Sequence, residues 1–426
     1  MTMSKLAING GTPVRITPFP EYVTIGEEEK RAVMEVLDST VLSKYLGTWS
    51  PEFFGGPRVQ KMEKEWAEYF GVKHAVTVNS ATSGLYAAVG ASGAGPGDEV
   101  IVSPYTMSAS ATAALVYGAI PVFADIDPDI FCVSPASIRE RITPSTRAII
   151  AVDLFGHPAD MDEIMRIARE NRLVVIEDAA QAPGAAVGGR YAGTLADMGV
   201  FSLNYHKTIH TGEGGVVVTN DDDLADRVRL IRNHAEVVVK AKGTADITNM
   251  IGFNYRMTEI EAAIGSEQLK KLERLLMPRI EAADYLSERL KEFPGLTPPV
   301  VRPATRHGYY VYAMRYDARQ TQAPRARLAA ALRAEGAPIS EGYVEPIYLQ
   351  PAYQQRIAFG RNGFPFTYAG YKGQVSYARG ICPVTERMYD EELLLTAVCH
   401  AGVLRRDLDD FATAFCKVYD HLDELR

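Results

Sequence analysis

The chain has 426 residues, of which 47% are hydrophobic and 23% charged, so a disordered or fibrous protein is excluded and two to three domains are expected. Its formal net charge of −8 argues against nucleic acid or an anionic membrane as partner, because both select clustered basic charge. We find no apolar run long enough to cross a membrane and no signal-peptide core in residues 1–20. The four cysteines lack metal-ligand spacing, so we expect no metal site and reduced thiols in a cytoplasmic protein: Cys132, Cys382, Cys399 and Cys416.

Residues 1–56 are rich in glycine, proline and aromatic residues, and we expect them to form an N-terminal arm with active-site loops. The aromatic run at 49–56 either closes over a site or docks the arm on the protein for stability. A helix is predicted to begin at Pro57, because proline suits the first helical position. Apolar residues then recur on one face of this helix, at Val59, Met62, Trp66 and Phe70.

Apolar runs alternate with helical patterns in the next part of the chain, and residues 57–275 are predicted to form one large domain. Seven of these runs are predicted strands: Ala75–Val78, Glu99–Val102, Ile120–Ala124, Ala148–Val152, Leu173–Ile176, Met198–Leu203 and Val216–Thr219. Most of the early strands are separated by predicted helices: Thr82–Ala91, Ser108–Tyr117, Pro135–Arg141 and Asp160–Glu170. This order predicts an α/β fold with a mostly parallel seven-stranded central sheet and helices on both faces. One of the last two strands can run antiparallel, because only a short loop joins them.

The carboxyl-terminal part, residues 276–426, is predicted to be a smaller α+β domain. A long helical stretch from Thr258 to Glu292 leads into it, and Pro278 is expected to break or kink that helix. The pattern beyond it predicts one strand and two helices: Tyr309–Tyr316, Pro324–Glu335 and Asp407–Leu422.

Polar residues follow several strands of the predicted sheet, where ligands bind in parallel α/β folds. Ser80, Ala81 and Thr82 begin a helix, where N–H groups and hydroxyls suit a phosphate, although the same residues would serve as an ordinary helix cap. Ser202 can donate to the same phosphate. Asp178 follows a fully apolar strand, where a carboxylate needs a cationic partner in either a structural ion pair or a binding site.

Lys207 lies in the short loop between the last two strands, where burial would lower the pKa of its amine and make it a nucleophile. A lone lysine in such a loop is more often solvated. Together with Asp178 and the phosphate-binding groups, however, Lys207 completes the set that pyridoxal 5′-phosphate requires. The lysine forms the Schiff base, and the carboxylate keeps the pyridine nitrogen protonated. The expected cofactor is therefore pyridoxal 5′-phosphate, with pyridoxamine 5′-phosphate as its intermediate form.

The order of these motifs resembles the DegT/DnrJ/EryC1/StrS family of pyridoxal-phosphate sugar aminotransferases, within fold type I (aspartate aminotransferase-like). The resemblance covers about residues 8–290 and continues more loosely to the end of the chain. Each motif is weak alone, but their order is specific: Asn79–Thr82, Gly97–Val102, Asp153–Gly156, Glu177–Gln181, Phe201–Gly215 and Asn254–Met257.

The resemblance implies a role for each matching residue. Lys207 would bind the cofactor covalently and move the proton in both half-reactions, and Asp178 would pair with the pyridine nitrogen. Gln181 would lie near the phenolic oxygen of the cofactor. Asn254 would reach the phosphate across the interface of a homodimer with shared active sites, with Arg256 close by. The phosphate would be held within one subunit by Ser80, Ala81, Thr82 and Ser202.

The sequence departs from the family pattern at several positions. Met107 stands where an aromatic residue usually covers the pyridine ring, and His210 stands where a small hydroxyl residue is common. Tyr348 replaces the histidine of many nucleotide-sugar enzymes, which, with Cys382–Arg387, is similar to the branch that acts on keto-cyclitols. Substrate contacts are expected from Tyr105, His206, His210, Arg256 and Tyr348.

A dehydratase branch of the family carries histidine in place of the Schiff-base lysine. Here Lys207 lies five residues before Gly212, and His206 precedes it, so the family position holds lysine. Amine transfer is therefore favoured over dehydration.

The resulting hypothesis is amine transfer from glutamate or glutamine to a ketone on a sugar, expected to be nucleotide-linked, or on a cyclitol. Amino-sugar, antibiotic or surface-glycan biosynthesis would use such a reaction, and a scyllo-inosose-type keto-cyclitol is the alternative acceptor. A rival hypothesis is a non-enzymatic regulatory or scaffold protein on the same fold. A third keeps the cofactor but performs another reaction, such as a pyridoxamine-dependent elimination. Substrate specificity is expected to reside in 20–56, 236–250 and 340–380, where the motifs match least.

Overall fold

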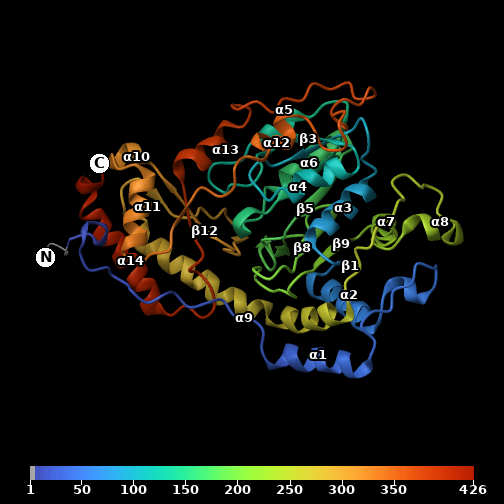
Figure 1. Ribbon diagram of the computed structural model, residues 1–426, viewed down its shortest axis with the longest axis horizontal. Helices are drawn as coiled ribbons and strands as arrows, with labels where there is room; N and C mark the ends of the chain where they lie inside the picture. The colour runs from blue at the N-terminus through green and yellow to red at the C-terminus, as the bar shows by residue number, and fades with distance from the viewer. Residues whose placement is uncertain (1–4) are drawn as a thin grey trace.

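The computed structural model describes residues 5–426, so the first four residues of the predicted arm lie outside the described part. A central sheet with flanking helices occupies one end of the molecule and a smaller domain the other, and one long helix runs between them (Figure 1). The large-domain helices are α2 (Pro57–Phe70), α3 (Ala81–Ser92), α4 (Ala109–Val116), α5 (Pro135–Arg141), α6 (Met161–Asn171), α7 (Asp222–Arg232) and α8 (Ala235–Lys242).

The predicted central sheet is confirmed, and its seven strands have the order β1-β9-β8-β5-β4-β2-β3. All neighbours from β8 to β3 pair in parallel, whereas β9 pairs antiparallel with both β1 and β8. The antiparallel strand is thus the one that follows the Lys207 loop. The strands are β1 (His74–Val78), β2 (Glu99–Val102), β3 (Ile120–Phe123), β4 (Thr146–Val152), β5 (Val174–Asp178), β8 (Met198–Ser202) and β9 (Gly215–Thr219).

Alternate side chains of the sheet enter two different cores, as the two faces of a strand require. On β9, Val217 packs with the core that includes residues of α3, α4 and α6. Its neighbours Val216 and Val218 pack on the opposite face with Trp66 of α2 and Leu272 of α9 (Glu259–Leu290). Burial on both faces explains why these strands are continuous apolar runs in the sequence.

The smaller domain is built on a four-stranded antiparallel sheet with the order β10-β12-β14-β13. Its strands are β10 (Leu296–Thr297), β12 (Tyr312–Tyr316), β13 (Ser340–Glu341) and β14 (Leu393–Thr396). The helices that follow β10 are α10 (Ala318–Thr321), α11 (Arg325–Ala334), α12 (Pro351–Gln354), α13 (Pro383–Arg387) and α14 (Arg405–Tyr419). A separate three-stranded sheet joins the two parts of the chain through β6 (Ala186–Val187), β7 (Arg190–Tyr191) and β11 (Thr305–Arg306).

A break or a kink was expected at Pro278: helix α9 continues through this residue without a break, and the helix changes direction along its length (Figure 1). Proline lacks the N–H group that would bond one turn back, which costs on the order of 3 kcal/mol in a helix interior. Burial on both sides of Pro278 offsets this cost: Leu269 and Leu272 pack under the central sheet, and Leu286 and Leu290 pack in the small domain. The domain boundary proposed at 275/276 therefore lies inside one continuous helix.

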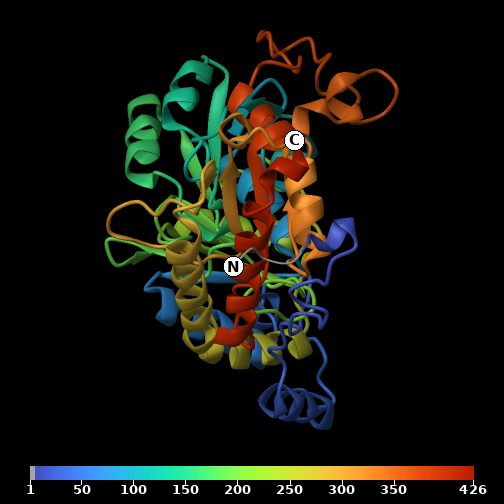
Figure 2. The same ribbon diagram turned by 90° about the vertical axis from the view of Figure 1, so that its left-hand side faces the viewer.

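Helix α1 (Glu27–Ser39) lies along α9 and forms the lower edge of the molecule in both views (Figures 1 and 2). Its inner face packs Ala32 and Val36 against Ala263 of α9. The outward-facing Met34 is 54% exposed, so one apolar side of α1 is uncovered in a single chain. Among residues 5–426, no helix combines the length and apolar character that a membrane crossing needs.

Candidate active site

A cavity of about 240 Å³ opens where β4, β5 and β8 end, at the carboxyl edge of the sheet. Nine of the residues predicted from the sequence line it together: Ser80, Ala81, Thr82, Met107, Asp178, Gln181, Ser202, His206 and Lys207. The small domain contributes Tyr310 and Tyr343. The cavity therefore lies between the two domains, and both supply its walls.

Lys207 projects from the loop between β8 and β9 into this cavity. Its Nζ lies 4.6 Å from the ring centre of Tyr310. Burial lowers the pKa of the amine to about 8, and the nearby carboxylate of Asp178 opposes this effect. At neutral pH, Lys207 is therefore neutral, and so nucleophilic, much more often than an exposed lysine.

Asp178 is the last residue of β5 and is 4% exposed. Its Oδ2 accepts a hydrogen bond from the Ser110 hydroxyl at 2.8 Å, and its Oδ1 accepts one from the Ala180 N–H at 3.2 Å. Burial raises the pKa of this carboxyl, and these hydrogen bonds and Lys207 oppose the shift. No ion pair within 4.0 Å joins Asp178 to a cation among residues 5–426, so the buried carboxylate lacks the partner that its charge requires.

The start of α3 forms the other end of the cavity. Ser80 caps the helix, and its Oγ accepts the Ser83 N–H at 3.1 Å. Gly215 of β9 passes directly behind, where a Cβ atom would lie 2.7 Å from the Ala81 nitrogen. Thr82 and Ser202, which both carry hydroxyls, also line the cavity. This close-packed helix start presents N–H groups and hydroxyls of the kind that bind a phosphate.

Gln181 lies beside Asp178 and is held at both ends of its amide. Its Oε1 accepts the Phe155 N–H at 2.7 Å, and its Nε2 donates to the Tyr343 hydroxyl at 3.1 Å. Burial raises the pKa of Tyr343. A contact between the domains therefore fixes the orientation of Gln181 in the cavity.

The carboxyls of Asp153, which directly follows β4, and Glu177, on the neighbouring strand β5, form a buried pair behind this wall. Asp153 Oδ1 accepts the Ala159 N–H at 2.9 Å, and Glu177 Oε2 accepts the Leu195 N–H at 2.8 Å. Burial raises the pKa of Asp153 well above its usual range and that of Glu177 to about 7. The pair therefore retains a proton near neutral pH.

The structure places Tyr105 and Tyr348 outside the cavity lining, although the sequence suggested both as substrate contacts. Tyr348 is fully buried, its hydroxyl donates to the Glu386 carboxylate, and its ring packs on Phe123. Tyr105 is also fully buried and packs edge-on against Tyr343, with ring centres 5.9 Å apart. Both side chains fill the interior behind the site in this conformation.

Arg256, His210 and Asn254 also lie outside the lining of the cavity in a single chain. Arg256 Nη1 donates to the Asn233 side chain at 3.0 Å. His210 donates its backbone N–H to Gln268 at 3.3 Å, and burial lowers the pKa of its imidazole. Asn254 is exposed, and its backbone carbonyl accepts a hydrogen bond from the Asn79 amide at 3.3 Å.

The polar lining residues that were not singled out in the sequence include Ser110, Tyr310 and Tyr343. Tyr343 lies in the 340–380 segment, which was expected to carry specificity. Tyr310 is the second residue of the predicted strand Tyr309–Tyr316, but no local pattern places that strand against the Lys207 loop. His206, which was predicted, is exposed at the mouth of the cavity, and burial and Lys207 lower its pKa.

The residues present fit pyridoxal 5′-phosphate. A buried carboxylate without a cationic partner, a lysine of lowered pKa and a helix start with hydroxyl groups surround one cavity. They match the pyridine nitrogen, the aldehyde carbon and the phosphate of this cofactor. Met107 is 62% exposed beside the cavity and is free to cover a ring.

The covered seven-stranded sheet, the small carboxyl-terminal domain and the lysine at the sheet edge define a fold type I aminotransferase. The chain belongs to the DegT/DnrJ/EryC1/StrS aminotransferase family, whose model matches residues 24–400. It is therefore an enzyme of the transaminase class, and the non-enzymatic alternative is not supported.

Two similar proteins show the range of this family. The chain is 41% identical to GDP-perosamine synthase of Caulobacter vibrioides over 288 residues. This aligned region covers 67% of this chain and 74% of that protein. It is 34% identical to L-glutamine:2-deoxy-scyllo-inosose aminotransferase of Streptoalloteichus tenebrarius over 439 residues. This aligned region covers 99% of each of the two proteins. Among solved structures, the aminotransferase from Psychrobacter cryohalolentis superposes with a TM-score of 0.80 at 27% identity, over 95% of this chain and all of the other.

Proposed function

We propose that this protein is a pyridoxal-phosphate-dependent aminotransferase that moves an amino group from glutamate or glutamine to a ketone on a sugar or cyclitol ring. The observation that carries the proposal is the convergence of Lys207, Asp178 and the start of α3 on one cavity. The similarity to the inosose aminotransferase over 99% of the chain and to GDP-perosamine synthase over 67% of it supports the same reaction.

Lys207 is the proposed covalent attachment point for the cofactor and the group that moves the proton. Its lowered pKa supports both roles, because the amine must be neutral to attack a carbonyl and to accept a proton. Once freed from the cofactor, the amine is held in the cavity beside Tyr310 and can accept the proton from the donor carbon. When bound, the cofactor supplies the electron sink that stabilises the negative charge left on that carbon.

Asp178 and the start of α3 would hold the cofactor at opposite ends. The buried carboxylate of Asp178 would pair with the protonated ring nitrogen, which relieves the cost of its own burial. Ser80, Ala81, Thr82 and Ser202 would hold the phosphate. Gln181, fixed by Phe155 and Tyr343, would lie near the phenolic oxygen.

We propose an uncharged ring ketone of the keto-cyclitol type as the first acceptor to test. Lys207 is the only lysine or arginine among the described residues that line the cavity, whereas Asp178 and Glu213 are carboxylates. A nucleotide-linked sugar brings a diphosphate, which needs cations that the lining from one chain does not offer. The match to the inosose aminotransferase over 99% of both chains supports the same order of candidates. The nucleotide-linked sugar, placed first from the sequence, becomes the second candidate, and GDP-perosamine synthase supports keeping it.

We also propose that the functional unit is a homodimer with shared sites. Asn254 is exposed near the Asn79 turn that precedes α3, where a second subunit could meet the phosphate end of the cavity. Large apolar side chains are exposed on the arm, on α1 and on the segment before Asn254: Val23, Met34, Leu37, Ile247 and Ile251. Covering these side chains with a second copy would remove their apolar surface from water.

The test uses the purified protein with pyridoxal 5′-phosphate. We expect a visible absorbance band that glutamate or glutamine bleaches and that a keto-cyclitol restores. Reduction with borohydride followed by peptide mass mapping should place the cofactor on Lys207. The Lys207→Ala variant should fold normally, judged by its circular dichroism, and lose amine transfer. Full turnover in this variant, or cofactor attached to another lysine, would reject the proposal.

A further inference from the structure

The segment that carries Lys207 is held from outside the cavity by residues of other elements. The Tyr22 hydroxyl donates to the Thr208 carbonyl at 2.6 Å. The His210 N–H donates to Oε1 of Gln268 on α9 at 3.3 Å. These two backbone groups lie one and three residues beyond Lys207, so the arm and α9 both restrain the end of its loop.

Gln268 is fully buried, and its contacts fix the direction of its amide. Its Nε2 donates to the Glu29 carboxylate at 2.8 Å and to the Thr24 carbonyl at 3.2 Å. Both of these partners accept only, so the amide nitrogen must face them. Its oxygen is therefore left pointing at the His210 N–H.

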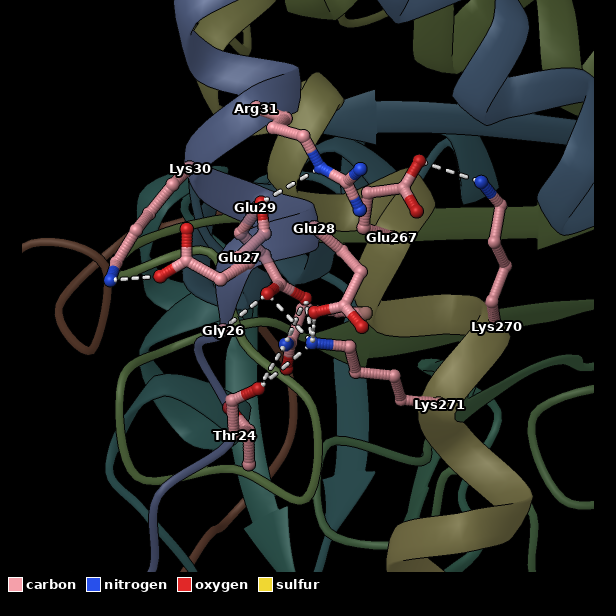
Figure 3. Close-up of polar contacts among 11 residues, drawn as sticks. Thr24, Gly26, Glu27, Glu28, Glu29, Lys30, Arg31, Glu267, Lys270 and Lys271 are labelled. Carbon is pink, nitrogen blue, oxygen red and sulfur yellow. Dashed lines mark hydrogen bonds and ion pairs between the residues drawn. The ribbon is translucent and has the colours of Figure 1, made fainter.

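The acceptors of Gln268 are themselves held by a buried ion pair. The Lys271 ammonium lies 2.7 Å from the Glu29 carboxylate, and the two side chains are 8% and 1% exposed. Lys271 also donates to the Thr24 carbonyl at 3.2 Å, and the Gly26 N–H donates to Glu29 at 2.7 Å. Figure 3 shows Lys271 pointing into the group formed by Thr24, Gly26 and Glu29, where α9 meets the start of α1. The arm is thereby anchored to α9 beside Gln268.

Tyr22 reaches the second wall of the cavity as well. Its ring lies 5.0 Å from the guanidinium of Arg279, the residue that follows Pro278 in α9. Arg279 Nη1 donates to the carbonyls of Tyr309 and Tyr310 at 3.1 and 3.2 Å. The ring of Tyr310 in turn faces the Lys207 ammonium. Tyr22 therefore contacts both the loop that carries Lys207 and the residue that positions the ring opposite it.

We propose that Tyr22 and Gln268 are positioning residues for Lys207, and that the Glu29–Lys271 pair keeps the arm in place for both. They touch the backbone of the loop or the residues around it and leave the cavity itself to other side chains. The value of this restraint for catalysis rests on the proposed role of Lys207, because proton transfer needs the amine at a fixed position. The restraint itself is a property of the cofactor-free chain and can be measured there.

The experiment compares Tyr22→Phe and Gln268→Leu with the wild-type protein, all without cofactor. Competitive acetylation over a pH series, read by mass spectrometry, reports the pKa of Lys207, and amide hydrogen exchange reports opening of residues 203–212. In both variants we expect exchange in this segment to be faster by about threefold to tenfold, because each variant loses one hydrogen bond to the backbone of the loop. The looser loop admits water to Lys207, so its pKa should rise from about 8 towards the value of an exposed lysine.

Lys270→Gln is the matched control. It removes the neighbouring Lys270–Glu267 pair on α9, which lies 2.6 Å apart on the surface and does not touch the Lys207 loop (Figure 3). This variant should leave exchange in 203–212 and the pKa of Lys207 unchanged. If it changes them as much as Gln268→Leu does, a general loosening of α9 explains the result and the proposal is wrong.

Tyr22→Phe decides the outcome if Gln268→Leu does not fold, because it removes a single hydroxyl from a half-buried ring. Unchanged exchange and an unchanged pKa of Lys207 in the folded variants would overturn the proposal. In the cofactor-loaded enzyme the same variants should lower kcat more than they raise KM, with partial recovery in Gln268→Asn. If Lys207 proved not to carry the cofactor, the exchange and acetylation results would still report on the restraint.

Discussion

Burying the Asp178 carboxylate costs free energy, and a cation bound in the cavity would offset that cost. Its carboxyl group is held by Ser110 and Ala180, which are neutral donors, while burial pushes its pKa upward. Neutral hydrogen bonds compensate a buried charge only in part, so a cation in the cavity gains from pairing with it. The same reasoning explains why Asp178 was recognisable in the sequence, where an acid follows an uninterrupted apolar strand.

The Asp178→Asn variant separates charge from shape. Asparagine can still accept from Ser110, so we expect the cofactor-free protein to fold and to be at least as stable as the wild type. Without the carboxylate the proposed ring nitrogen loses its partner, and kcat should fall by about 10²–10³, which corresponds to the loss of a buried charge pair. Thermal unfolding and steady-state kinetics test the two statements. Wild-type turnover in the variant would contradict the role given to Asp178.

The buried Glu177 carboxyl should make the unfolding free energy of the protein depend on pH. Its folded-state pKa of about 7 lies above that of an unfolded glutamic acid, so the stability it contributes is complete at low pH and is lost as pH rises towards 7. Glutamine can accept from Leu195 and donate to Asp153 without titrating. Relative to Glu177→Gln, the wild type should lose up to about 3 kcal/mol of unfolding free energy between pH 4.5 and 8.

Urea unfolding across this pH range measures the difference. Glu170→Gln is the matched control, because Glu170 is exposed and its pKa is lowered by Arg139. Removing the Glu170 carboxylate should not flatten the pH dependence of the unfolding free energy. A constant difference between the wild type and Glu177→Gln over the whole range would show that the buried pair does not titrate there.

At the scale of elements, the phosphate end of the site depends on how closely β9 approaches the start of α3. A Cβ on Gly215 would lie 2.7 Å from the Ala81 nitrogen and 2.9 Å from the Phe201 carbonyl oxygen, both backbone atoms. Neither can move without displacing its helix or strand. Gly215 therefore allows β9 to pack closely against the start of α3.

Gly215→Ala should displace the start of α3. We expect a loss of about 1–3 kcal/mol of stability from overpacking and weaker binding of pyridoxal 5′-phosphate, measured by thermal unfolding and by titration of the visible band. Gly95→Ala is a suitable control near the other end of α3, because a Cβ at that position would lie 3.9 Å from its closest neighbour, the Asn249 side chain. Equal effects of the two substitutions would show that the tight approach at Gly215 does not matter.

The elements differ in how well the sequence predicted them. The strands of the central sheet were predicted well because burial on both faces leaves uninterrupted apolar runs, and the residues that end them form much of the site. Of the break or kink expected at Pro278, the break does not occur, because packing along both halves of α9 outweighs the local preference of proline. Tyr310 and Tyr343 were missed because they enter from a different domain, and only the long-range fold brings them to Lys207. Tyr348, named from resemblance, lies in a packed interior that local sequence does not reveal.

At the scale of the whole molecule, a single chain exposes apolar side chains and a predicted phosphate-binding residue to solvent. Asn254 is exposed, and Met34 on the outer side of α1 and Ile251 near Asn254 are apolar and exposed. A second copy that covers these residues would account for both the apolar surface and the position of Asn254. The proposed homodimer thus makes a prediction about activity as well as about size.

Mixed dimers test whether two subunits build each site. Lys207→Ala and Asn254→Ala dimers should each have very low activity, since every site lacks one of the two groups. After dissociation and reassociation in equal amounts, half of the dimers are hybrids, and each hybrid has one site that combines an intact Lys207 with an intact Asn254 from the other chain. We expect recovery of about one quarter of wild-type activity, from the symmetry of a two-fold dimer. Light scattering should confirm the dimer before and after mixing. No recovery in a confirmed hybrid would place Asn254 in the site of its own subunit or outside both sites.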